Sequence, residues 1–470
     1  MLASMALRLT ITASRLPVNS QTPSFGNLTF HVQTFGCQMN KHDSERVVGM
    51  LESLGARDVD TIEEADIVVF MTCCVREAAD VRLIGQVNTM KNVKLRKDSP
   101  LSKRIIAVGG CIGQRDGDKL FKELPHLSVV FGTNNLASLP GLIGDVLESG
   151  HCKAETLEES NLFPTDLPTT REHSWAAWLP ITIGCNNFCT YCIVPYVRGR
   201  EKSRSLEEIV AEAQRYVDSG VKEITLLGQN VNSYGRDLYG EPRFADVLKA
   251  VDATGIERLR FATSHPKDLT DEVIEMFGSL RSLMPALHLP AQSGSNRVLK
   301  DMHRNYTIER YHELIEKLRK ACPNIALSTD IIVGFPGETE ADFEDTYRLV
   351  DEVGYSQVFT FIYSKREGTP AASMIDDTPH EVIQERFDRL VDLVQQRAFE
   401  ANQVDLNTTV PVLIEGVSKR DSNLLSGKTP KNQTVHAPLP EGISLEDVVG
   451  AIVPIAIDEA RTWYLRGHFA

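Results

Sequence analysis

Short apolar runs and longer amphipathic stretches alternate along the first third of the chain. The apolar runs predict strands over residues 29–35, 66–72 and 104–109, and the amphipathic stretches predict helices over residues 43–54 and 76–90. This alternation is typical of a doubly wound parallel sheet with helices on its faces. We expect one α/β domain over residues 29–150.

The pattern repeats from Trp178 onward, with strands that are each followed by a helix. Strands are predicted over residues 178–184, 221–227, 256–263, 285–289, 325–333 and 357–363, and the amphipathic stretch 379–402 closes this region. Six βα units predict a partial TIM-like barrel, two strands short of the usual eight. We assign residues 175–405 to this (βα)6 barrel and residues 151–174, with Pro164 and Pro168, to a linker.

The last part of the chain changes character. Short strands are predicted over residues 410–414, 434–436, 451–457 and 462–465, between turns rich in Gly, Pro, Asn and Asp. This spacing is typical of a small antiparallel β-barrel, which we expect over residues 407–470.

Residues 1–28 form a predicted tail. The chain has no acidic residue up to Asn40, and it carries Arg8 and Arg15, a composition that resembles a mitochondrial transit peptide. The alternatives are a tail without regular structure and a start codon placed too far upstream. We favour these alternatives, and with them a cytoplasmic protein.

The composition adds constraints on the partners. The chain has 470 residues, 42% hydrophobic and 24% charged, with a formal net charge of -14, which is typical of a globular protein. No apolar run approaches the roughly 18 residues of a membrane-spanning helix, so we expect no membrane partner. Because the net charge is negative, nucleic-acid binding must rely on a local basic patch.

Nine cysteines indicate metal chemistry rather than a disulfide framework. Cys37, Cys73 and Cys111 each follow a predicted strand of the first domain. Because the carboxyl ends of neighbouring parallel strands meet at one edge of the sheet, we expect these three to share one metal site. Cys152 and Cys322 lie outside the motifs, and we interpret them as small buried hydrophobic residues.

The strongest motif is a C-x3-C-x2-C run formed by Cys185, Cys189 and Cys192, directly after the first predicted barrel strand. Three thiolates on one loop can bind three irons of a [4Fe–4S] cluster and leave the fourth iron open to an external molecule. A zinc site completed by a distant ligand such as His173 is the alternative. We favour it less, because zinc motifs usually contain two complete ligand pairs.

This spacing, with Tyr191 before the last cysteine and a βα barrel behind it, resembles the radical S-adenosylmethionine (SAM) superfamily. In that superfamily SAM binds the open iron, and one electron cleaves it into methionine and a 5′-deoxyadenosyl radical. The resemblance implies SAM contacts from loops that follow the barrel strands. The residues concerned are Gly228, Gln229, Asn230, Ser264, Gln292, Ser293 and Gly334.

Further blocks narrow the resemblance. Residues 34–40, 72–77 and 109–115 resemble the amino-terminal domain of methylthiotransferases, and residues 415–432 resemble the TRAM RNA-binding module. Together with residues 193–201, they make the chain similar to MiaB-type tRNA methylthiotransferases. The resemblance implies a second, auxiliary [4Fe–4S] cluster on Cys37, Cys73 and Cys111.

The implied reaction adds a methylthio group at C2 of N6-(dimethylallyl)adenosine at position 37 of tRNA, next to the anticodon. The radical removes the C2 hydrogen, the auxiliary site delivers sulfur and a second SAM supplies the methyl group. A radical is needed because this carbon carries no acidic proton that a general base could remove. No catalytic side chain is assigned.

The implied partners are the tRNA anticodon stem-loop with its dimethylallyl adenosine, an electron donor such as flavodoxin or ferredoxin, and a sulfur source. We expect a monomer. Ribosomal protein S12 or threonylcarbamoyl-adenosine tRNA are alternative substrates for the same chemistry. A non-enzymatic iron–sulfur or zinc-stabilised RNA-binding protein is the alternative outside enzymes.

Basic residues in two places could meet the RNA. Arg198, Arg200, Lys202 and Arg204 follow the cluster loop, and Lys419, Arg420 and Lys428 lie on the small barrel. We expect contact near the cluster loop, because splayed single-stranded bases are the usual targets of specific RNA readers. We interpret the basic run over residues 91–104 as a solvated face, and His303 and Arg304 as solvated surface residues.

The chain departs from the family at two positions. Met71 stands where the family usually has Asn, so a hydrogen bond around the auxiliary cluster would be lost. Cys74 stands where a small residue is common. Because adjacent residues of an extended chain point in opposite directions, we expect Cys73 to face the cluster and Cys74 to point away.

Overall fold

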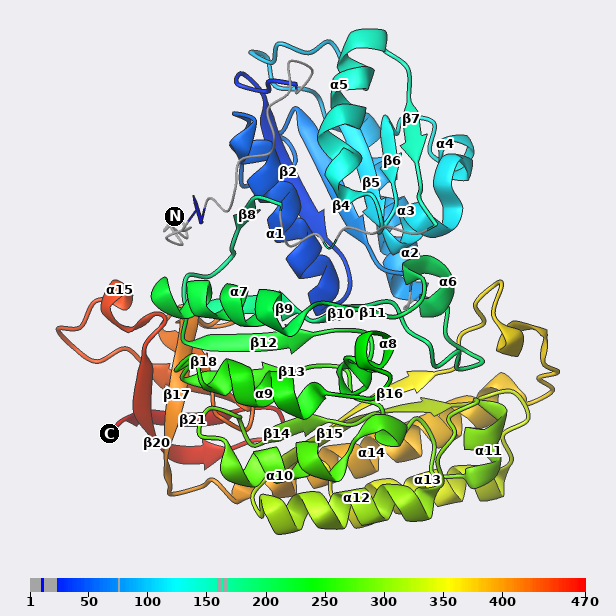
Figure 1. The fold of residues 1–470 in the computed structure, drawn as a ribbon, viewed down its shortest axis with the longest axis vertical. Coiled ribbons are helices and arrows are strands. Elements are labelled where there is room, and N and C mark those ends of the chain that lie inside the picture. Colours follow the sequence, from blue (N-terminus) through cyan, green and yellow to red (C-terminus); the bar gives the residue numbers. More distant parts are fainter. Residues whose placement is uncertain (1–9, 12–22, 75–76, 159–162, 164–166) are drawn as a thin grey trace. The chain divides into compact units, whose positions relative to one another are not determined.

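The structure is a computed structural model of the chain (Figure 1), and it describes residues 10–11, 23–74, 77–158, 163 and 167–470. The chain divides into two compact units. The first consists of Met1–Ser174, Ile183–Asn186 and Cys192–Glu201, and the second consists of Trp175–Thr182, Asn187–Tyr191 and Lys202–Ala470.

The first unit is built on a six-stranded parallel sheet with the strand order β3-β2-β4-β5-β6-β7. Its strands are β2 (Thr29–Thr34), β3 (Arg57–Asp58), β4 (Ile67–Thr72), β5 (Ile105–Gly110), β6 (Val129–Phe131) and β7 (Lys153–Glu155). Every residue of β4 and β5 is buried, as expected for central parallel strands with both faces covered. The three predicted strands are confirmed. The pattern does not predict β3, β6 and β7, because two or three residues are too few to show a periodicity.

Helices cover both faces of this sheet. They are α1 (Gln38–Ser53), α2 (Glu77–Thr89), η1 (Met90–Asn92), α3 (Cys111–Asp116), η2 (Gly117–Lys119), α4 (Leu120–Glu123), η3 (Leu136–Ser138), α5 (Leu139–Ser149) and α6 (Val194–Arg198). Successive residues of β4 point to opposite faces, so Val69 packs with α1 and α5 while Phe70 packs with α2 and α3. Helix α1 begins at Gln38, earlier than the predicted residue 43, and this start makes Cys37 its N-cap.

The predicted tail and linker are described only in part. Residues 1–9, 12–22, 159–162 and 164–166, which include Pro164, lie outside the described residues. Within the tail, β1 (Thr10–Ile11) pairs antiparallel with β8 (Thr169–Thr170). The linker prediction differs from the structure in its first residues, because β7 adds a sixth strand to the sheet there.

The second unit contains the six predicted barrel strands, arranged as two three-stranded parallel sheets with the orders β13-β12-β9 and β14-β15-β16. They are β9 (Ala176–Pro180), β12 (Glu223–Leu227), β13 (Arg258–Phe261), β14 (Ala286–His288), β15 (Ala326–Val333) and β16 (Gln357–Ile362). Two short strands, β10 (Thr182–Ile183) and β11 (Lys202–Ser203), lie between β9 and β12 in the sequence. The (βα)6 partial barrel is confirmed.

Helices alternate with these strands along the chain. They are α7 (Leu206–Asp218), η5 (Val231–Ser233), α8 (Arg236–Tyr239), α9 (Phe244–Asp252), η6 (Pro266–Asp268), α10 (Asp271–Ser279), α11 (Asn296–Asp301), α12 (Ile308–Ala321), α13 (Glu340–Val353), η7 (Pro370–Ser373) and α14 (His380–Gln403). Figure 1 shows α9, α10 and α12 along the strands, and their apolar faces join one large core with them. Helix α7 is capped by Ser205, whose Oγ accepts a hydrogen bond from the N–H of Glu208.

The second unit ends in a small closed barrel with the strand order β17-β18-β19-β21-β20. Its elements are β17 (Thr409–Val417), β18 (Leu424–Lys428), β19 (Thr434–Pro438), α15 (Leu445–Val448), β20 (Ile452–Ala460) and β21 (Leu465–Phe469). The sequence predicts β17, β19 and β20, whereas the strand predicted over residues 462–465 shares only Leu465 with β21. The pattern misses β18, because its sequence LLSGK holds only two apolar residues.

Across the described part of the chain, no helix is both long enough and apolar enough to cross a membrane.

Candidate functional site

The three cysteines predicted to share a site lie at one edge of the sheet in the first unit. Cys37 caps α1 after β2, Cys73 follows β4, and Cys111 opens α3 directly after β5. These strands are neighbours, and the register pairs Thr72 of β4 with Gly110 of β5. The sheet order therefore brings together cysteines that are far apart in the sequence.

Two glycines let the backbone approach this edge closely. Gly36 has φ 115°, and a Cβ atom there would lie 2.3 Å from Cys73 Cβ. Gly110 has φ 87°, and a Cβ atom there would lie 2.6 Å from the carbonyl oxygen of Thr72. Because L side chains rarely adopt such φ values and have no room here, both positions require glycine.

The thiols at this edge form two hydrogen-bonded pairs. Cys73 donates to Cys37 and lowers the pKa of Cys37 to about 5, and the positive charge of Arg198 acts in the same direction. Cys74 donates to Cys111, and this bond together with Arg198 lowers the pKa of Cys111 to about 6. The thiolate is the form of cysteine that binds metal, so the lowered pKa values of Cys37 and Cys111 favour metal binding.

The expectation that Cys74 points away from the site is wrong. Its side chain is fully buried in the same apolar core as Cys111, and both burial and its hydrogen bond to Cys111 raise its pKa. The strand alternation fails here because β4 ends at Thr72, before the two adjacent cysteines. Met71 lies in the core on the other face of the sheet, where an apolar side chain fits.

Arg198 lies beside these cysteines and is only 8% exposed. Its Nη2 donates to Asn40 Oδ1 at 3.0 Å and to Asp43 Oδ2 at 3.2 Å. Although burial opposes it, the charge of Arg198 contributes to holding the pKa of Asp43 below its usual range. Arg198 was expected to contact RNA. Its burial contradicts this expectation, because its guanidinium is enclosed by Asn40, Asp43 and the cysteines.

The C-x3-C-x2-C loop begins with a tight backbone approach. Gly184 has φ 75°, and a Cβ atom there would lie 2.1 Å from the carbonyl oxygen of Arg200. The N–H of Cys185 donates to the carbonyl oxygen of Gly199 at 3.1 Å. Cys185 and Cys192 are partly exposed. The start of the loop is therefore fixed by glycine and by backbone hydrogen bonding, while these two sulfurs remain accessible.

The middle cysteine of the loop, Cys189, is buried beside Arg304 in the second unit. Arg304 Nη1 lies 3.7 Å from Cys189 Sγ, and its Nη2 donates to the carbonyl oxygen of Pro290 at 2.6 Å. Arg304 is 4% exposed, so its interpretation as a solvated residue is wrong, whereas His303 is exposed as expected. Local sequence could not show this burial, because Cys189 is 115 residues away in the chain.

Polar side chains with unused hydrogen-bonding atoms gather after the first three barrel strands. The carboxyl ends of these strands are where barrel enzymes bind their substrates. Within the described residues, five buried polar atoms there have no hydrogen-bond partner: Thr182 Oγ1, Asn230 Oδ1, Asn232 Nδ2, Ser264 Oγ and His265 Nε2. Since buried polar atoms nearly always have partners, this group fits a polar ligand such as SAM.

His265 was not singled out from the sequence, although it directly follows the predicted contact Ser264. Its Nδ1 accepts a hydrogen bond from the N–H of Lys267 at 3.1 Å, which puts the ring proton on Nε2. Burial, with the nearby charges of Arg304 and Lys267, holds its pKa well below the usual value. His265 is therefore a neutral donor whose Nε2–H is unused within the described residues.

The predicted SAM contacts after β12 fit the same region. Gly228 permits a close approach, because a Cβ atom there would lie 2.3 Å from Thr182 Oγ1. Asn230 is oriented by Asp268, to which its Nδ2 donates at 2.7 Å. Gln229, which lies between Gly228 and Asn230 in the sequence, is half-buried.

The residues after β14 and β15 that are predicted to contact SAM make hydrogen bonds to other groups of the protein. Ser293 Oγ lies 3.2 Å from Thr346 Oγ1, and the N–H of Gly334 donates to Glu338 Oε1 at 3.3 Å. Gln292 is buried with a left-handed backbone, φ 73°. These interactions fix the shape of both loops.

The basic residues after the cluster loop separate into two kinds. Arg204 is 3% exposed, donates to the carbonyl oxygen of Pro180 at 2.9 Å and pairs with Glu212 at 2.8 Å. The expectation that Arg204 contacts RNA is therefore contradicted by its burial, as it is for Arg198. Arg200 is exposed and Lys202 is half-buried.

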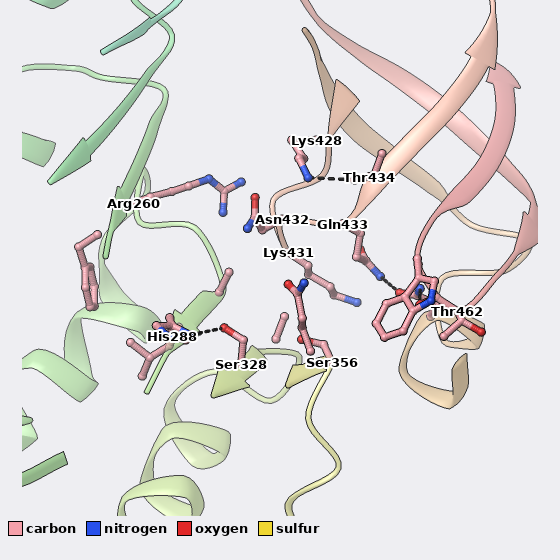
Figure 2. Close-up of a pocket in the computed structure, with 17 residues that line it drawn as sticks. Arg260, His288, Ser328, Ser356, Lys428, Lys431, Asn432, Gln433, Thr434 and Thr462 are labelled. Carbon is pink, nitrogen blue, oxygen red and sulfur yellow. Dashed lines mark hydrogen bonds between the residues drawn. The ribbon is translucent and has the colours of Figure 1, made fainter. Parts of the chain in front are cut away.

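The basic residues of the small barrel lie at different depths. Lys419 and Arg420 are exposed between β17 and β18, whereas Lys428 is half-buried and donates to Thr434 Oγ1 at 2.9 Å. Figure 2 shows Lys428 and Lys431 with Arg260 around a cavity of about 170 Å³. The cavity lies at the amino ends of β14, β15 and β16, the end opposite to the loops described above.

The structure also bears on the zinc alternative. Among the residues described, no three His, Cys, Asp or Glu side chains are grouped so as to hold a metal ion, and this applies to the cysteines of the two expected clusters as well as to zinc. His173, the ligand considered for that alternative, lies beside Glu172 at 3.8 Å.

Comparison with known families divides the chain as the sequence motifs do. The Radical SAM superfamily matches residues 179–350, the uncharacterized protein family UPF0004 matches residues 29–132, and the TRAM domain matches residues 403–470.

Curated relatives cover nearly the whole chain. A protein of Thermoanaerobacter sp. (strain X514), named tRNA-2-methylthio-N(6)-dimethylallyladenosine synthase, is 46% identical over 94% of this chain and 93% of its own length. A protein of the same name from Caldicellulosiruptor saccharolyticus is 48% identical over 94% of this chain and 92% of its own length. The chain belongs to this synthase family. It is accordingly a radical SAM enzyme, and membership implies that it binds SAM and [4Fe–4S] clusters.

A solved structure shares the fold at low sequence identity. The radical S-adenosylmethionine methyltransferase TsrM from Kitasatospora setae, with cobalamin and a [4Fe-4S] cluster bound, matches with a TM-score of 0.52 and 12% identity. The match covers 74% of each chain. It supports the (βα)6 architecture of the synthase fold described above.

Proposed function

We propose that the protein converts N6-(dimethylallyl)adenosine at position 37 of tRNA to 2-methylthio-N6-(dimethylallyl)adenosine. The observation that carries this proposal is a second set of cysteines at a sheet edge, in a chain that also has a C-x3-C-x2-C loop and a TRAM domain. A radical SAM enzyme that only removed a hydrogen atom would need the loop alone. A second site suits a reaction that also delivers sulfur.

Cys185, Cys189 and Cys192 would hold the cluster that activates SAM. When bound, this cluster supplies the electron that cleaves SAM and so provides a radical able to remove the C2 hydrogen of adenine. Arg304 would hold the middle cysteine of this set in place, because its Nη1 lies 3.7 Å from Cys189 Sγ. The neutral His265 would donate from Nε2 to SAM or substrate, beside the orphaned oxygen atoms of the neighbouring loops.

Cys37, Cys73 and Cys111 would hold the auxiliary cluster. Their sheet edge offers sulfurs on three neighbouring strand ends, and Gly36 and Gly110 keep backbone atoms close to them. Arg198 offsets the negative charge that thiolates bring into a buried place.

The remaining basic residues would contact the tRNA. Arg200 and Lys202 follow the cluster loop, and Lys419, Arg420 and Lys428 belong to the TRAM domain. Contacts of this kind go to phosphates and make binding weaker at higher salt concentration. An electron donor of the flavodoxin or ferredoxin type and a sulfur source complete the reaction, which a monomer in the cytoplasm would carry out.

The proposal is tested by anaerobic iron and sulfide counting together with nucleoside mass spectrometry of tRNA from cells that lack their own synthase. We expect about eight irons per wild-type chain. We expect about four irons after either triple substitution, Cys185/Cys189/Cys192→Ala or Cys37/Cys73/Cys111→Ala. Each triple variant should abolish the methylthio mark, and Cys322→Ala serves as the matched control.

The outcomes also separate the alternatives. Zinc in place of iron would contradict radical chemistry. Eight irons with unmodified tRNA would point to another substrate, such as ribosomal protein S12 or threonylcarbamoyl-adenosine tRNA. Two clusters with tRNA binding but no cleavage of SAM would indicate a non-enzymatic RNA-binding protein.

A further inference from the structure

Helix α2 of the first unit exposes apolar side chains on the face that points away from its sheet. Its inner face, with Leu83 and Val87, is buried in the core that covers one side of the sheet. On the outer face Val81 is 66% exposed and Ile84 is 41% exposed. The outer face of such a helix is usually polar, and residues three apart on a helix are neighbours. These two side chains therefore form one exposed apolar patch, which is typical of a contact surface.

A glycine lies next to this patch in the interior of the helix. Gly85 is exposed, and a Cβ atom built on it would meet no described atom within 4 Å. Glycine in a helix interior is less favourable than alanine, and no packing among the described residues requires it here. What the missing side chain does provide is space for another molecule to come close to the helix backbone beside Ile84.

The charges around the patch are positive. Arg82 on α2, Lys91 in η1 and Lys94 directly after it are exposed, and none of them has an ion-pair partner among the described residues. Asp80, an acidic residue of α2, is already paired with Arg115 at 2.8 Å. In a chain with a net charge of -14, this local positive surface would attract an acidic partner.

The apolar part of the surface distinguishes between two acidic partners. RNA is bound mainly through contacts to phosphates and through stacking of bases on aromatic side chains or arginine. Val81 and Ile84 are aliphatic and cannot stack on a base, whereas aliphatic side chains next to basic ones suit an acidic protein. The observations therefore favour a protein partner over RNA.

We propose that an acidic electron-transfer protein of the flavodoxin or ferredoxin type docks on this surface. The α2 surface consists of Val81, Arg82, Ile84, Gly85, Lys91 and Lys94. The inference rests on the proposed function, which requires an external electron donor. In the docked complex the donor is oxidised by one electron, and the enzyme is reduced by one electron.

The position of α2 suits this role. The helix begins at Glu77, four residues after Cys73 at the sheet edge, and Val81 lies about 6 Å along its axis. Because electron transfer slows steeply with distance, a donor must bind near the site that it reduces. Transient electron-transfer complexes bury less than about 1,200 Å², so a surface on one helix and the segment after it is sufficient.

The first test measures binding of oxidised flavodoxin to the reconstituted enzyme by isothermal titration calorimetry. We expect weaker binding at higher salt concentration, and a loss of about tenfold or more in affinity in Arg82→Glu/Lys91→Glu. The matched control, Lys249→Glu/Lys320→Glu, changes the net charge equally at exposed lysines of α9 and α12 and should bind as the parent does. Equal weakening in both variants would overturn the proposal. So would a variant that keeps its affinity for flavodoxin and loses affinity for tRNA, because the surface would then contact RNA.

The second test uses Gly85→Leu, which places a bulky side chain where the fold leaves space. Leucine favours a helix more than glycine does, so the midpoint of urea unfolding should not fall. Reduction of the enzyme by flavodoxin hydroquinone, followed by absorbance, should slow severalfold, whereas reduction by dithionite should be unchanged, because this small reductant needs no docking surface. An unchanged rate with flavodoxin, or equal slowing with both reductants, would overturn the proposal. Normal docking and reduction with unmodified tRNA would instead refute the proposed function and leave the docking surface in place.

Discussion

Two buried arginines stand beside the cysteines that would hold the clusters. Arg198 contacts the sheet-edge group and Arg304 contacts Cys189, and each is less than a tenth exposed. An arginine remains charged at all accessible pH values, so each supplies a permanent positive charge where thiolates are needed. Arginines usually lie at the surface, and the sequence did not predict the burial of these two, because their partners come from distant segments of the chain.

The role of Arg198 predicts a shift in the reactivity of Cys37 in the metal-free protein. Arg198→Ala removes a nearby opposite charge, an effect worth about 1–3 pKa units. The pKa of Cys37 should therefore rise from about 5. The rate at which iodoacetamide alkylates Cys37 is measured by peptide mass spectrometry as the pH is lowered. Because only the thiolate reacts, this rate should begin to fall at a higher pH in Arg198→Ala than in the parent.

The matched control is Arg200→Ala, which removes an exposed arginine two residues further along the loop. It should leave the alkylation profile of Cys37 unchanged. The same profile in Arg198→Ala as in the parent would show that the guanidinium does not stabilise the thiolate.

At the scale of elements, strand β13 joins the barrel of the second unit to the TRAM domain. Arg258 Nη1 donates to the carbonyl oxygen of Lys428 at 2.9 Å, and its Nη2 donates to that of Pro411 at 2.8 Å. Arg260 donates in the same way to Thr429 and Pro430 at 2.8 and 2.9 Å. Two arginines of one strand thus bind backbone oxygens at the start of β17 and the end of β18.

This arrangement predicts a stability defect in Arg258→Ala. The substitution leaves two carbonyl oxygens without their arginine donor, which costs about 1–3 kcal/mol for each oxygen, whereas Glu223 keeps its pair with Arg260 at 2.9 Å. We expect the midpoint of urea unfolding to fall and the TRAM domain to become more sensitive to protease. Arg310→Ala, at an exposed pair with Glu313, should change stability by less than about 0.5 kcal/mol. Similar midpoints for both variants would contradict the proposed attachment.

Elements with a clear hydrophobic pattern could be predicted from the sequence. The buried runs of β4 and β5, the six barrel strands and the long helix α14 all appear where the pattern indicates. Strand β18 and the early start of α1 could not be predicted, because their sequences are largely polar and tertiary contacts decide their structure.

At the scale of the whole molecule, motif spacing predicted the family and the gathering of cysteines, whereas it could not predict what surrounds them. The orientation of Cys74 depends on where β4 ends, and the burial of Arg304 depends on a partner more than a hundred residues away. Likewise, His265 becomes a candidate only when its hydrogen bond to the N–H of Lys267 fixes the proton on Nε2. Such features arise from long-range packing, which a local pattern does not contain.

The central claim is that this chain removes the C2 hydrogen of the modified adenosine with a radical derived from SAM. The most direct test supplies the reconstituted enzyme with SAM, reductant, sulfide and a tRNA whose dimethylallyl adenosine carries deuterium at C2. We predict that deuterium appears in 5′-deoxyadenosine while the nucleoside gains its methylthio group. A methylthio product without deuterium in 5′-deoxyadenosine would contradict this account.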